Sequence, residues 1–367
     1  MPVDTSHLFA SRDEARAVAR KPIALSFCCN CGHIYNRDFD ASSVVYDSAY
    51  ENSQMFSPTF KRYALDLIER LAATYALDHA SVVELGGGRG DFLRLLCEAT
   101  ASHGTSFDPS YTPTEAETRD PSVTFVPEMY SDRHARTKAD FVLCRHVLEH
   151  LERPEELLAS LRTIAKEPDS GVYVEVPNAA FILREAASWE IIYTHCSYFT
   201  EQSLVGLLRR SGLGVHECVE SFGTQFLSVD ARRDDAGETQ VVDPTVMLTL
   251  DALASSFAIA CKAKITAWRG ELSARLAAGK RVVLWGAGAK SVAFLNELEV
   301  GAGIDYVVDL NPRKTGTYIP GTGQQIVSPQ FLSEVQPDTV IILNKNYQRE
   351  IVEAANRYGA PQEYLLA

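Results

Sequence analysis

Long hydrophobic runs are missing from this 367-residue sequence. No stretch approaches about 18 uninterrupted apolar residues, the length that a membrane-spanning helix needs. The first residues, MPVDTSHLFASRDEARAVAR, also lack the apolar core of a signal peptide. These absences predict a cytoplasmic protein that has no membrane partner.

An excess of positive charge is missing as well. The chain has 35 Lys and Arg residues against 48 Asp and Glu residues, which gives a formal net charge of −13. Nucleic acids are bound by clustered Lys and Arg side chains, so this balance argues against a nucleic-acid partner. We expect a small-molecule substrate, and an anionic one would have to meet local donors. The sequence does not indicate an oligomeric state.

A second cysteine pair is also missing. Of the eight cysteines, only Cys28 and Cys31 have the C-x-x-C spacing. A structural zinc site needs four ligands, and such sites are commonly built from two pairs. Two interpretations stay open: zinc held by Cys28 and Cys31 with ligands from elsewhere, or a reduced turn that remains from a lost metal site. Most other cysteines lie in predicted strands and helices, so we expect no disulfides.

The features that are present are typical of a globular α/β protein. Apolar residues make up 46% of the chain. Because a domain typically has roughly 150 residues, a chain of this length is expected to form two or three domains. Short apolar runs alternate with helical patterns, which predicts βαβ units and parallel sheets. Two late strands around Gly223 are predicted to close the first sheet in an antiparallel manner. We expect a small module over 1–56, a first α/β domain over 57–232, and a smaller α/β domain over 245–367, after a charged linker.

One glycine run has the form of a nucleotide-binding loop. The segment VVELGGGRGDFLRLL, 82–96, places Gly86, Gly88 and Gly90 between a predicted strand and an amphipathic helix. Glu84 opens the motif, and Asp108 ends the next predicted strand, where an acid accepts the two ribose hydroxyls of a nucleotide. The pattern resembles the E/D-x-G-x-G-x-G motif of class I S-adenosylmethionine (SAM) methyltransferases. A dinucleotide fingerprint would need glycine at position 91, which is Asp91.

The segment RHVLEHL, 145–151, has two interpretations. HVLEH matches the inverted zincin signature H-x-x-E-H, which would make His146 and His150 zinc ligands. The segment follows the predicted strand DFVLC, however, and strand ends in α/β folds carry ligand loops. It resembles the fourth motif of class I methyltransferases, and this resemblance implies that Arg145 and His146 lie at the SAM site. Plain packing is the third alternative.

A second glycine loop, VVLWGAGAKS, lies at 282–291, and Asp309 ends the next predicted strand. Serine replaces the third glycine of a dinucleotide fingerprint, so we favour a Rossmann-like domain that helps to bind the acceptor over an NAD site. A helix N-terminus and a cation suit anions. The candidates for contact with a substrate diphosphate are Gly286, Gly288, Lys290 and Asn311.

The chain resembles the three-part SAM-dependent C-methyltransferases that act on nucleotide-linked deoxysugars. Four segments carry this resemblance: the two glycine loops, the segment RHVLEHL, and the segment IIYTHCSYF at 191–199. Those enzymes combine a zinc-binding module, a class I methyltransferase domain with a Rossmann-like sheet, and a C-terminal Rossmann-like domain. The resemblance implies SAM as the cofactor and natural-product biosynthesis as the setting. It also implies that a 4-keto sugar attached to thymidine diphosphate is methylated at the adjacent carbon through an enolate.

The resemblance also implies site residues. The family pattern Y-x-E-H-x-S-Y-F makes His195 the base, and Tyr193 or Tyr198 could donate a hydrogen bond to the enolate oxygen. Further candidates are Tyr50 and Ser57 at the methionine part of SAM, and Gln225 at the acceptor. Where the pattern has an acid, this chain has Thr194. Glu149 or Glu190 could replace that acid.

Thr194 also motivates two rival functions. One is an O- or N-methyltransferase of another small molecule, which needs no carbon base. The other is a SAM-binding protein that no longer methylates.

Overall fold

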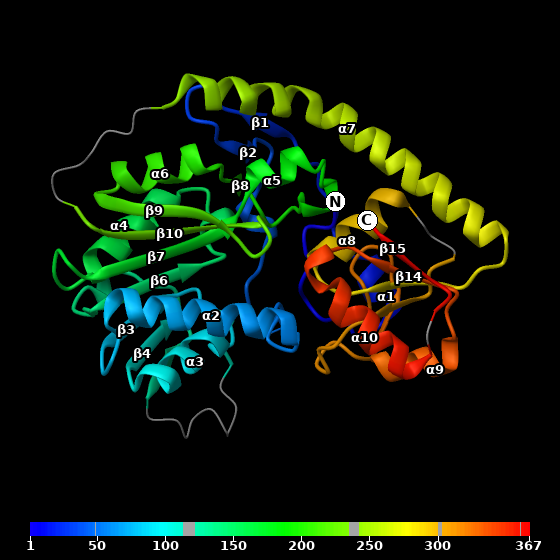
Figure 1. Ribbon diagram of the computed structural model, residues 1–367, viewed down its shortest axis with the longest axis horizontal. Helices are drawn as coiled ribbons and strands as arrows, with labels where there is room; N and C mark the ends of the chain where they lie inside the picture. The colour runs from blue at the N-terminus through cyan, green and yellow to red at the C-terminus, as the bar shows by residue number, and fades with distance from the viewer. Residues whose placement is uncertain (48, 113–121, 235–241, 300–302, 360) are drawn as a thin grey trace.

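The computed structural model describes residues 1–367 except 48, 113–121, 235–241, 300–302 and 360. The expected charged linker therefore lies partly outside the described residues. The described part contains a seven-stranded sheet, a five-stranded sheet and a small three-stranded sheet. Figure 1 shows the two larger sheets side by side, with helix α7 (Pro244–Ala277) running along one edge of both. The predicted α/β fold with two sheets is confirmed.

The seven-stranded sheet has the order β5-β4-β3-β6-β7-β10-β9. Strands β3 to β7 are parallel, and β10 pairs antiparallel with both β7 and β9, as predicted for the late strands around Gly223. The strand bounds are β3 (Ser81–Leu85), β4 (His103–Phe107), β5 (Val123–Val126), β6 (Phe141–Arg145), β7 (Gly171–Pro177), β9 (Leu213–Ser221) and β10 (Phe226–Arg233).

Alternate residues of these strands bury against helices on opposite faces. Val82 and Leu143 pack with helices α2 (Pro58–Tyr75) and α3 (Asp91–Thr100). Val83 and Val142 pack on the other face with α4 (Pro154–Ile164) and α6 (Glu201–Arg210). Because side chains in a strand alternate between faces, nearly continuous apolar strands are the expected signature of a sheet covered on both sides.

Helix α2 begins at a residue pair that is typical of a helix start. The Ser57 hydroxyl accepts a hydrogen bond from the Phe60 amide, and Pro58 occupies the first turn. A hydroxyl at the N-cap satisfies one of the unpaired amides of the first turn, while proline needs no partner there.

The five-stranded sheet is parallel throughout, with the order β13-β12-β11-β14-β15. Its strands are β11 (Val282–Trp285), β12 (Tyr306–Val308), β13 (Gln325–Val327), β14 (Thr339–Ile342) and β15 (Glu363–Leu366). Helix α8 (Ala289–Leu298) covers one face, and α9 (Leu332–Val335) and α10 (Gln348–Tyr358) cover the other. In both large sheets, the strand that precedes a glycine loop lies where the strand order reverses, the usual place for a ligand site.

The N-terminal segment reaches both large sheets. Strands β1 (Leu25–Phe27) and β2 (Ile34–Asn36) are completed by β8 (Ser197–Tyr198), which directly follows His195 and Cys196. Residues before them, including α1 (Arg12–Arg16), lie against the five-stranded sheet, where Phe9 bridges Tyr318. The first segment is thus joined to the chain on both sides of the molecule.

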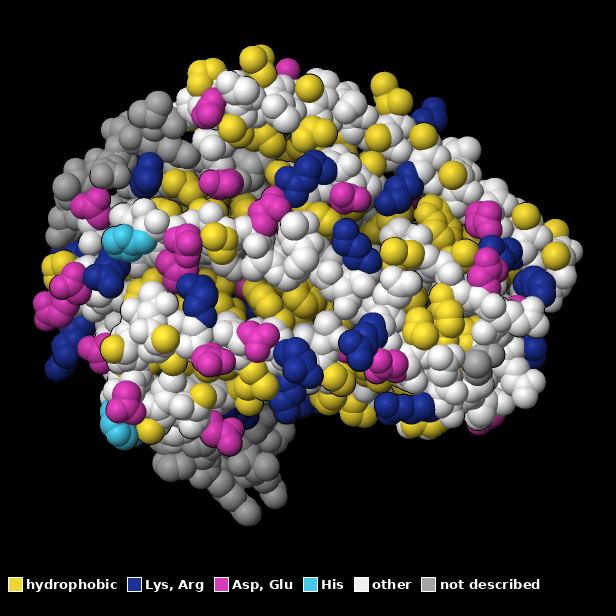
Figure 2. Space-filling model, in the orientation of Figure 1, with side chains coloured by type: hydrophobic (Ala, Val, Ile, Leu, Met, Phe, Trp, Pro, Cys, Tyr) yellow, Lys and Arg dark blue, Asp and Glu magenta, His cyan; other side chains and the backbone are white. Residues whose placement is uncertain are grey.

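Helix α7 is long and apolar enough to cross a membrane by length and composition alone, with a mean hydropathy of 1.5 over its most apolar window. One such helix is weak evidence. Its Leu272 packs in the core beside α8, while Leu248 and Ile259 are exposed. Figure 2 shows hydrophobic side chains along this helix at the top, and basic and acidic side chains interspersed over the rest of that face.

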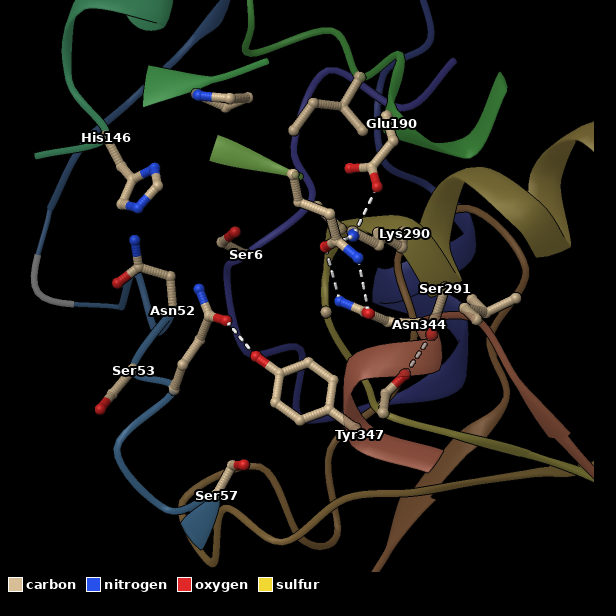
Figure 3. Close-up of a pocket in the computed structure, with 18 of the residues that line it drawn as sticks. Ser6, Asn52, Ser53, Ser57, His146, Glu190, Lys290, Ser291, Asn344 and Tyr347 are labelled. Carbon is tan, nitrogen blue, oxygen red and sulfur yellow. Dashed lines mark hydrogen bonds and ion pairs between the residues drawn. The ribbon is translucent and has the colours of Figure 1, made fainter. Parts of the chain in front are cut away.

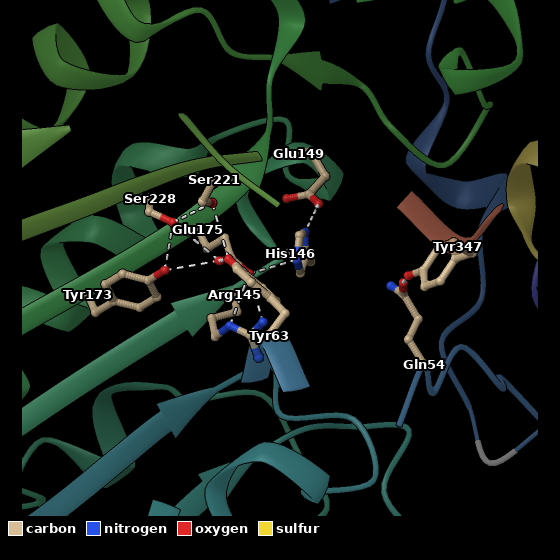
Figure 4. A network of polar contacts seen from close by, with 10 residues as sticks. All are labelled: Gln54, Tyr63, Arg145, His146, Glu149, Tyr173, Glu175, Ser221, Ser228 and Tyr347. Atoms are coloured by element: carbon tan, nitrogen blue, oxygen red, sulfur yellow. Dashed lines mark hydrogen bonds and ion pairs between the residues drawn. The ribbon is translucent and has the colours of Figure 1, made fainter. Parts of the chain in front are cut away.

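A buried ion pair joins two neighbouring strands of the first sheet. Arg145 of β6 and Glu175 of β7 are register partners, and the guanidinium Nη2 lies 2.7 Å from the carboxylate Oε1. The same carboxylate accepts hydrogen bonds from the hydroxyls of Tyr63 and Tyr173 (Figure 4). Burial alone would raise the pKa of Glu175, but Arg145 and His146 outweigh it and hold that pKa far below its usual range.

We predict that Glu175→Gln lowers the free energy of unfolding by about 3 kcal/mol, because Arg145 would keep its buried charge without a carboxylate. The ionised carboxylate contributes its full stabilisation above the unfolded pKa of about 4.3, and this contribution is lost as the pH falls toward the folded pKa. Urea unfolding at about pH 7 and about pH 3.5 therefore should show a smaller difference between wild type and variant at the lower pH. The exposed Glu152→Gln is the control, and an equal effect of both substitutions would contradict the prediction.

Candidate active site

Two cavities adjoin at the carboxyl ends of the parallel strands. The glycine-loop cavity, about 250 Å³, lies at the end of β3 and is lined by Glu84, Gly86, Gly88 and Asp108 among others. The central cavity, about 320 Å³, lies between the two large sheets (Figure 3). His195 is among the residues that line it. Residues that line both are Tyr50, Asn52, Ser53, Gln54, His146 and His150.

The glycine loop needs its glycines for conformation and for space. Gly86, Gly88 and Gly90 all have positive φ, which side chains rarely adopt. A Cβ on Gly90 would lie 2.0 Å from the Phe125 ring, so Gly90 allows close packing beneath the cavity and does not line it. A Cβ on Gly88 would meet only Asn52, at 3.8 Å, so this glycine faces open space.

The two acids of the loop lie as a nucleoside site requires. Asp108 Oδ2 accepts a hydrogen bond from the Gly88 amide at 2.7 Å, which fixes this carboxylate at the end of β4. Glu84 is buried, and its Oε2 has no hydrogen-bond partner among the described residues. Burial raises the pKa of Glu84 to about 7. An orphaned carboxylate oxygen beside an open glycine loop fits the donor groups of SAM.

His146 forms part of the wall between the two cavities. Its backbone has φ 56, a left-handed conformation that costs free energy for a residue with a side chain. Nε2 lies 3.0 Å from Glu175 and Nδ1 lies 3.6 Å from Glu149 (Figure 4). Burial would lower the pKa of His146, but the two carboxylates outweigh it and raise that pKa to about 9. The wall therefore carries a cation at neutral pH.

His195 lines the central cavity and packs edge-on against His150, with 4.7 Å between the ring centroids. His150 Nδ1 lies 2.9 Å from the Thr194 carbonyl oxygen and 2.9 Å from the Tyr46 hydroxyl. A carbonyl can only accept, so we assign the proton of His150 to Nδ1. Burial and the neighbouring His150 lower the pKa of His195 to about 3, so its imidazole is neutral at neutral pH.

The inverted zincin arrangement is not the cluster that the fold assembles. Among the described residues, the group of three or more metal-ligating side chains that comes together is Glu149, His150 and His195, with ligating atoms within 4.8 Å of one another. His146 lies outside this group. The motif contributes its last two residues, and the third comes from the segment before β8.

The two candidate tyrosines lie away from both cavities. The Tyr193 hydroxyl oxygen accepts from the Asp40 amide at 3.0 Å, and the Tyr198 hydroxyl donates to the Ile192 carbonyl oxygen at 3.1 Å. Neither residue lines the glycine-loop cavity or the central cavity, and Tyr198 lines a separate, smaller cavity beside β1 and α5 (Ala179–Arg184). The pairing of β8 with β2 fixes Tyr198, and both hydroxyls bond to backbone groups outside the two cavities, so the structure does not place either hydroxyl for the predicted contact with an enolate oxygen.

The predicted acceptor residues gather on the far side of the central cavity. Gly286, Gly288, Lys290 and Gln225 line it, and Lys290 Nζ lies 2.5 Å from Glu190 and 3.0 Å from Gln225 Oε1 (Figure 3). Asn311 also lines it, but its amide already donates to Glu51, so its side chain ties the N-terminal segment to the second sheet.

Tyr50 and Ser57 were both predicted to contact SAM, but the structure places them differently. Tyr50 lines both cavities, whereas Ser57 lines only the central one and its hydroxyl donates to Glu350. Arg145 lines the glycine-loop cavity, where its guanidinium stacks 4.1 Å over the Phe92 ring.

Sequence reasoning missed Asn344 and Tyr347, which follow β14 and line the central cavity. Asn344 exchanges two hydrogen bonds of 2.8 Å with Gln225, and the Tyr347 hydroxyl donates to Gln54. These contacts join the two sheets across the cavity. The rule that ligands bind at the carboxyl ends of parallel strands would have pointed to Asn344.

Cys28 and Cys31 lie in the turn between β1 and β2, with Cys29 exposed beside them. Within the described part of the chain, no group of three or more close metal-ligating side chains includes Cys28 or Cys31. A zinc site built on these two thiols therefore stays a prediction without a third ligand in view.

We predict that Gly90→Ala and Asp108→Ala each raise the Kd for SAM at least tenfold, or about 1.4 kcal/mol. The first forces the Phe125 ring out of place, and the second removes an acceptor from the ribose position. Isothermal titration calorimetry measures both. Gly270→Ala, on α7 with no atom within 4 Å of the added Cβ, is the control. Unchanged affinity in both folded loop variants would exclude this cavity as the SAM site.

Comparisons with known proteins agree with this geometry. Residues 52–217 match the model of a methyltransferase domain, and residues 249–363 match the model of a C-methyltransferase C-terminal domain. The C-methyltransferase NovU of Streptomyces niveus is 27% identical over 369 residues, which covers 95% of this chain and 86% of that protein.

Similar solved structures cover about half of the chain. They include 1,6-didemethyltoxoflavin-N1-methyltransferase from Burkholderia thailandensis, which is 19% identical. The match covers 48% of this chain and 82% of that chain, with a TM-score of 0.37. Another is magnesium protoporphyrin IX methyltransferase from Synechocystis, which is 18% identical. The match covers 48% of this chain and 84% of that chain, with a TM-score of 0.36. Likeness at this level carries no argument about substrate or catalytic residues. These matches identify the chain as a SAM-dependent methyltransferase whose C-terminal part is similar to the C-terminal domain of C-methyltransferases.

Proposed function

We propose that this methyltransferase methylates a carbon atom next to the ketone of a nucleotide-linked sugar, with His195 as the base. The observation that carries the proposal is the contact between the two cavities. The central cavity holds His195, and it shares a wall with the glycine-loop cavity. A carbon acceptor in the central cavity would therefore have a base and a methyl source within reach.

The glycine-loop cavity is the proposed SAM site. Gly88 leaves room for the ligand, Gly86 allows the close approach of Val147, Asp108 would accept the ribose hydroxyls, and Glu84 offers an unpartnered oxygen. When bound, SAM supplies an electrophilic methyl group. The chain's own residues must therefore generate a carbon nucleophile.

The proposed proton transfer uses neutral His195. Its imidazole accepts the proton from the carbon next to the ketone, and the electron pair of that C–H bond moves into the new C=C bond. The carbonyl oxygen takes the negative charge, so an enolate forms. Its carbon would then bond to the methyl group of bound SAM as the sulfur–methyl bond breaks and the sulfur keeps that electron pair. His146 supports this step, because its cation in the cavity wall offsets negative charge in the central cavity.

The nucleotide part of the acceptor would lie at the second glycine loop. A Cβ at Gly286 or Gly288 would meet no atom within 4 Å, so the backbone there is open to a ligand. Helix α8 begins at this loop with Lys290 in its first turn, and Lys314 is buried beside it with Nζ 2.9 Å from the Ala287 carbonyl oxygen. A helix N-terminus and local cations suit a diphosphate, despite the net charge of −13.

One observation favours a second candidate, an O- or N-methyltransferase. A pKa of about 3 makes His195 a weak base. An acceptor oxygen or nitrogen that carries its own lone pair would not need a strong one.

We predict that wild-type protein transfers labelled methyl from SAM to the carbon skeleton of a thymidine-diphosphate 4-keto-6-deoxysugar. In deuterated buffer it should also exchange the proton at the adjacent carbon. His195→Ala should slow both processes by roughly 10²-fold or more, because it removes the base, and it should keep its affinity for SAM. Mass spectrometry reads label and deuterium together.

The exposed His216→Gln is the matched control and should behave as wild type. Label on oxygen or nitrogen of a tested acceptor, with no carbon exchange, would replace this proposal by the second candidate. SAM binding without any transfer would remove the sugar assignment.

A further inference from the structure

A buried carboxylate beside His195 has no part in the mechanism described so far. Glu149 lies in the short helix Leu148–His150, directly after the wall residue His146, and lines the central cavity. The residue is 2% exposed, and its Oε2 has no hydrogen-bond partner among the described residues. A buried charge without a full set of partners is costly, so its retention needs an explanation.

The position directly before His195 offers no charge. Thr194 is buried, and its hydroxyl oxygen also lacks a partner within the described part of the chain. Its carbonyl oxygen is engaged by His150 Nδ1, which ties the segment before β8 to the helix that carries Glu149. The ligating atoms of Glu149, His150 and His195 all lie within 4.8 Å of one another.

The charge balance agrees with this geometry. Burial alone would raise the pKa of Glu149, but the hydrogen bond and the positive charge of His146 outweigh it and hold that pKa below its usual range. Glu149 is thus ionised at neutral pH. Its charge favours the protonated form of His195, against burial and the neighbouring His150.

We propose that Glu149 is the positioning carboxylate for His195, and that it orients the imidazole and stabilises the imidazolium formed when His195 takes the substrate proton. This inference rests on the proposed function. The carboxylate comes from the loop after β6, on the SAM side of the cavity, and not from the residue beside the base. Glu149 itself exchanges no proton with the substrate: the proton moves from carbon to His195, and the negative charge of the enolate lies on the ketone oxygen.

The test compares full-length wild type, Glu149→Gln, His195→Ala and the double variant E149Q/H195A. The readouts are the rate of solvent deuterium exchange into the keto sugar nucleotide and the Kd for SAM. We expect Glu149→Gln to slow exchange by roughly 10²-fold and to change the Kd for SAM less than threefold. Because Glu149 acts through His195, E149Q/H195A should exchange within twofold of His195→Ala. Glu297→Gln is the control, because the Glu297 carboxylate accepts a hydrogen bond from the Ser188 hydroxyl and lines neither cavity.

A compensating variant separates positioning from general damage. E149Q/T194E returns a carboxylate to the position directly before His195 and should exchange at least tenfold faster than Glu149→Gln. Exchange by Glu149→Gln within threefold of wild type would overturn the inference. A further large loss in E149Q/H195A would also overturn it, because Glu149 would then act independently of His195.

The same cluster could instead hold a metal ion, and the experiment distinguishes this. Exchange that a chelator abolishes and a divalent cation restores would overturn the positioning role. If wild type exchanges no proton at all, the proposed function fails and the inference fails with it. If wild type exchanges and Glu149→Gln has no effect, only the inference fails.

Discussion

The buried carboxylate of Glu175 is the constraint on which the rest of the site depends. A fully buried charge needs compensation from several sides, and here it comes from the neighbouring strand, the loop after it, and two hydroxyls from α2 and from β7 itself. Arg145 and His146 both form ion pairs with this one carboxylate. These contacts hold the backbone of His146, directly after β6, in a strained conformation. That strain places His146 in the wall between the two cavities and turns the following residues toward the central cavity.

The charges near the base form an alternating series. Glu175 holds His146 as a cation, His146 holds Glu149 as an anion, and Glu149 faces the two neutral rings of His150 and His195. Opposite charges at each step keep ionised groups in a region that burial would otherwise neutralise. His146 also separates the two proposed sites: the cavity proposed for SAM lies on one side of it, and the proposed base His195 lies on the other.

How much the sequence could predict depends on whether the signal is local. The strands, both glycine loops and Asp108 follow from short-range patterns, and the structure has them where they were expected. The positions of Tyr193 and Tyr198 could not be read this way, because they depend on distant partners: β8 pairs Tyr198 with a strand about 160 residues earlier, and the Tyr193 hydroxyl accepts from the Asp40 amide. Glu149 and Thr194 come together only through the His150 hydrogen bond, a contact between segments 44 residues apart. Asn344 and Gln225 likewise meet only across the cavity.

The N-terminal segment has a consequence for how the chain folds. Its Arg20 donates to the Gly321 carbonyl oxygen, 301 residues later, and Glu51 contacts Asn311 and Arg313. During synthesis from the N-terminus, Arg20 and Glu51 leave the ribosome long before residues 311–321, so their partners do not yet exist. Contacts of such high sequence separation are slow to form. The methyltransferase sheet can therefore assemble early, whereas closure of the central cavity is a late event that needs the whole chain.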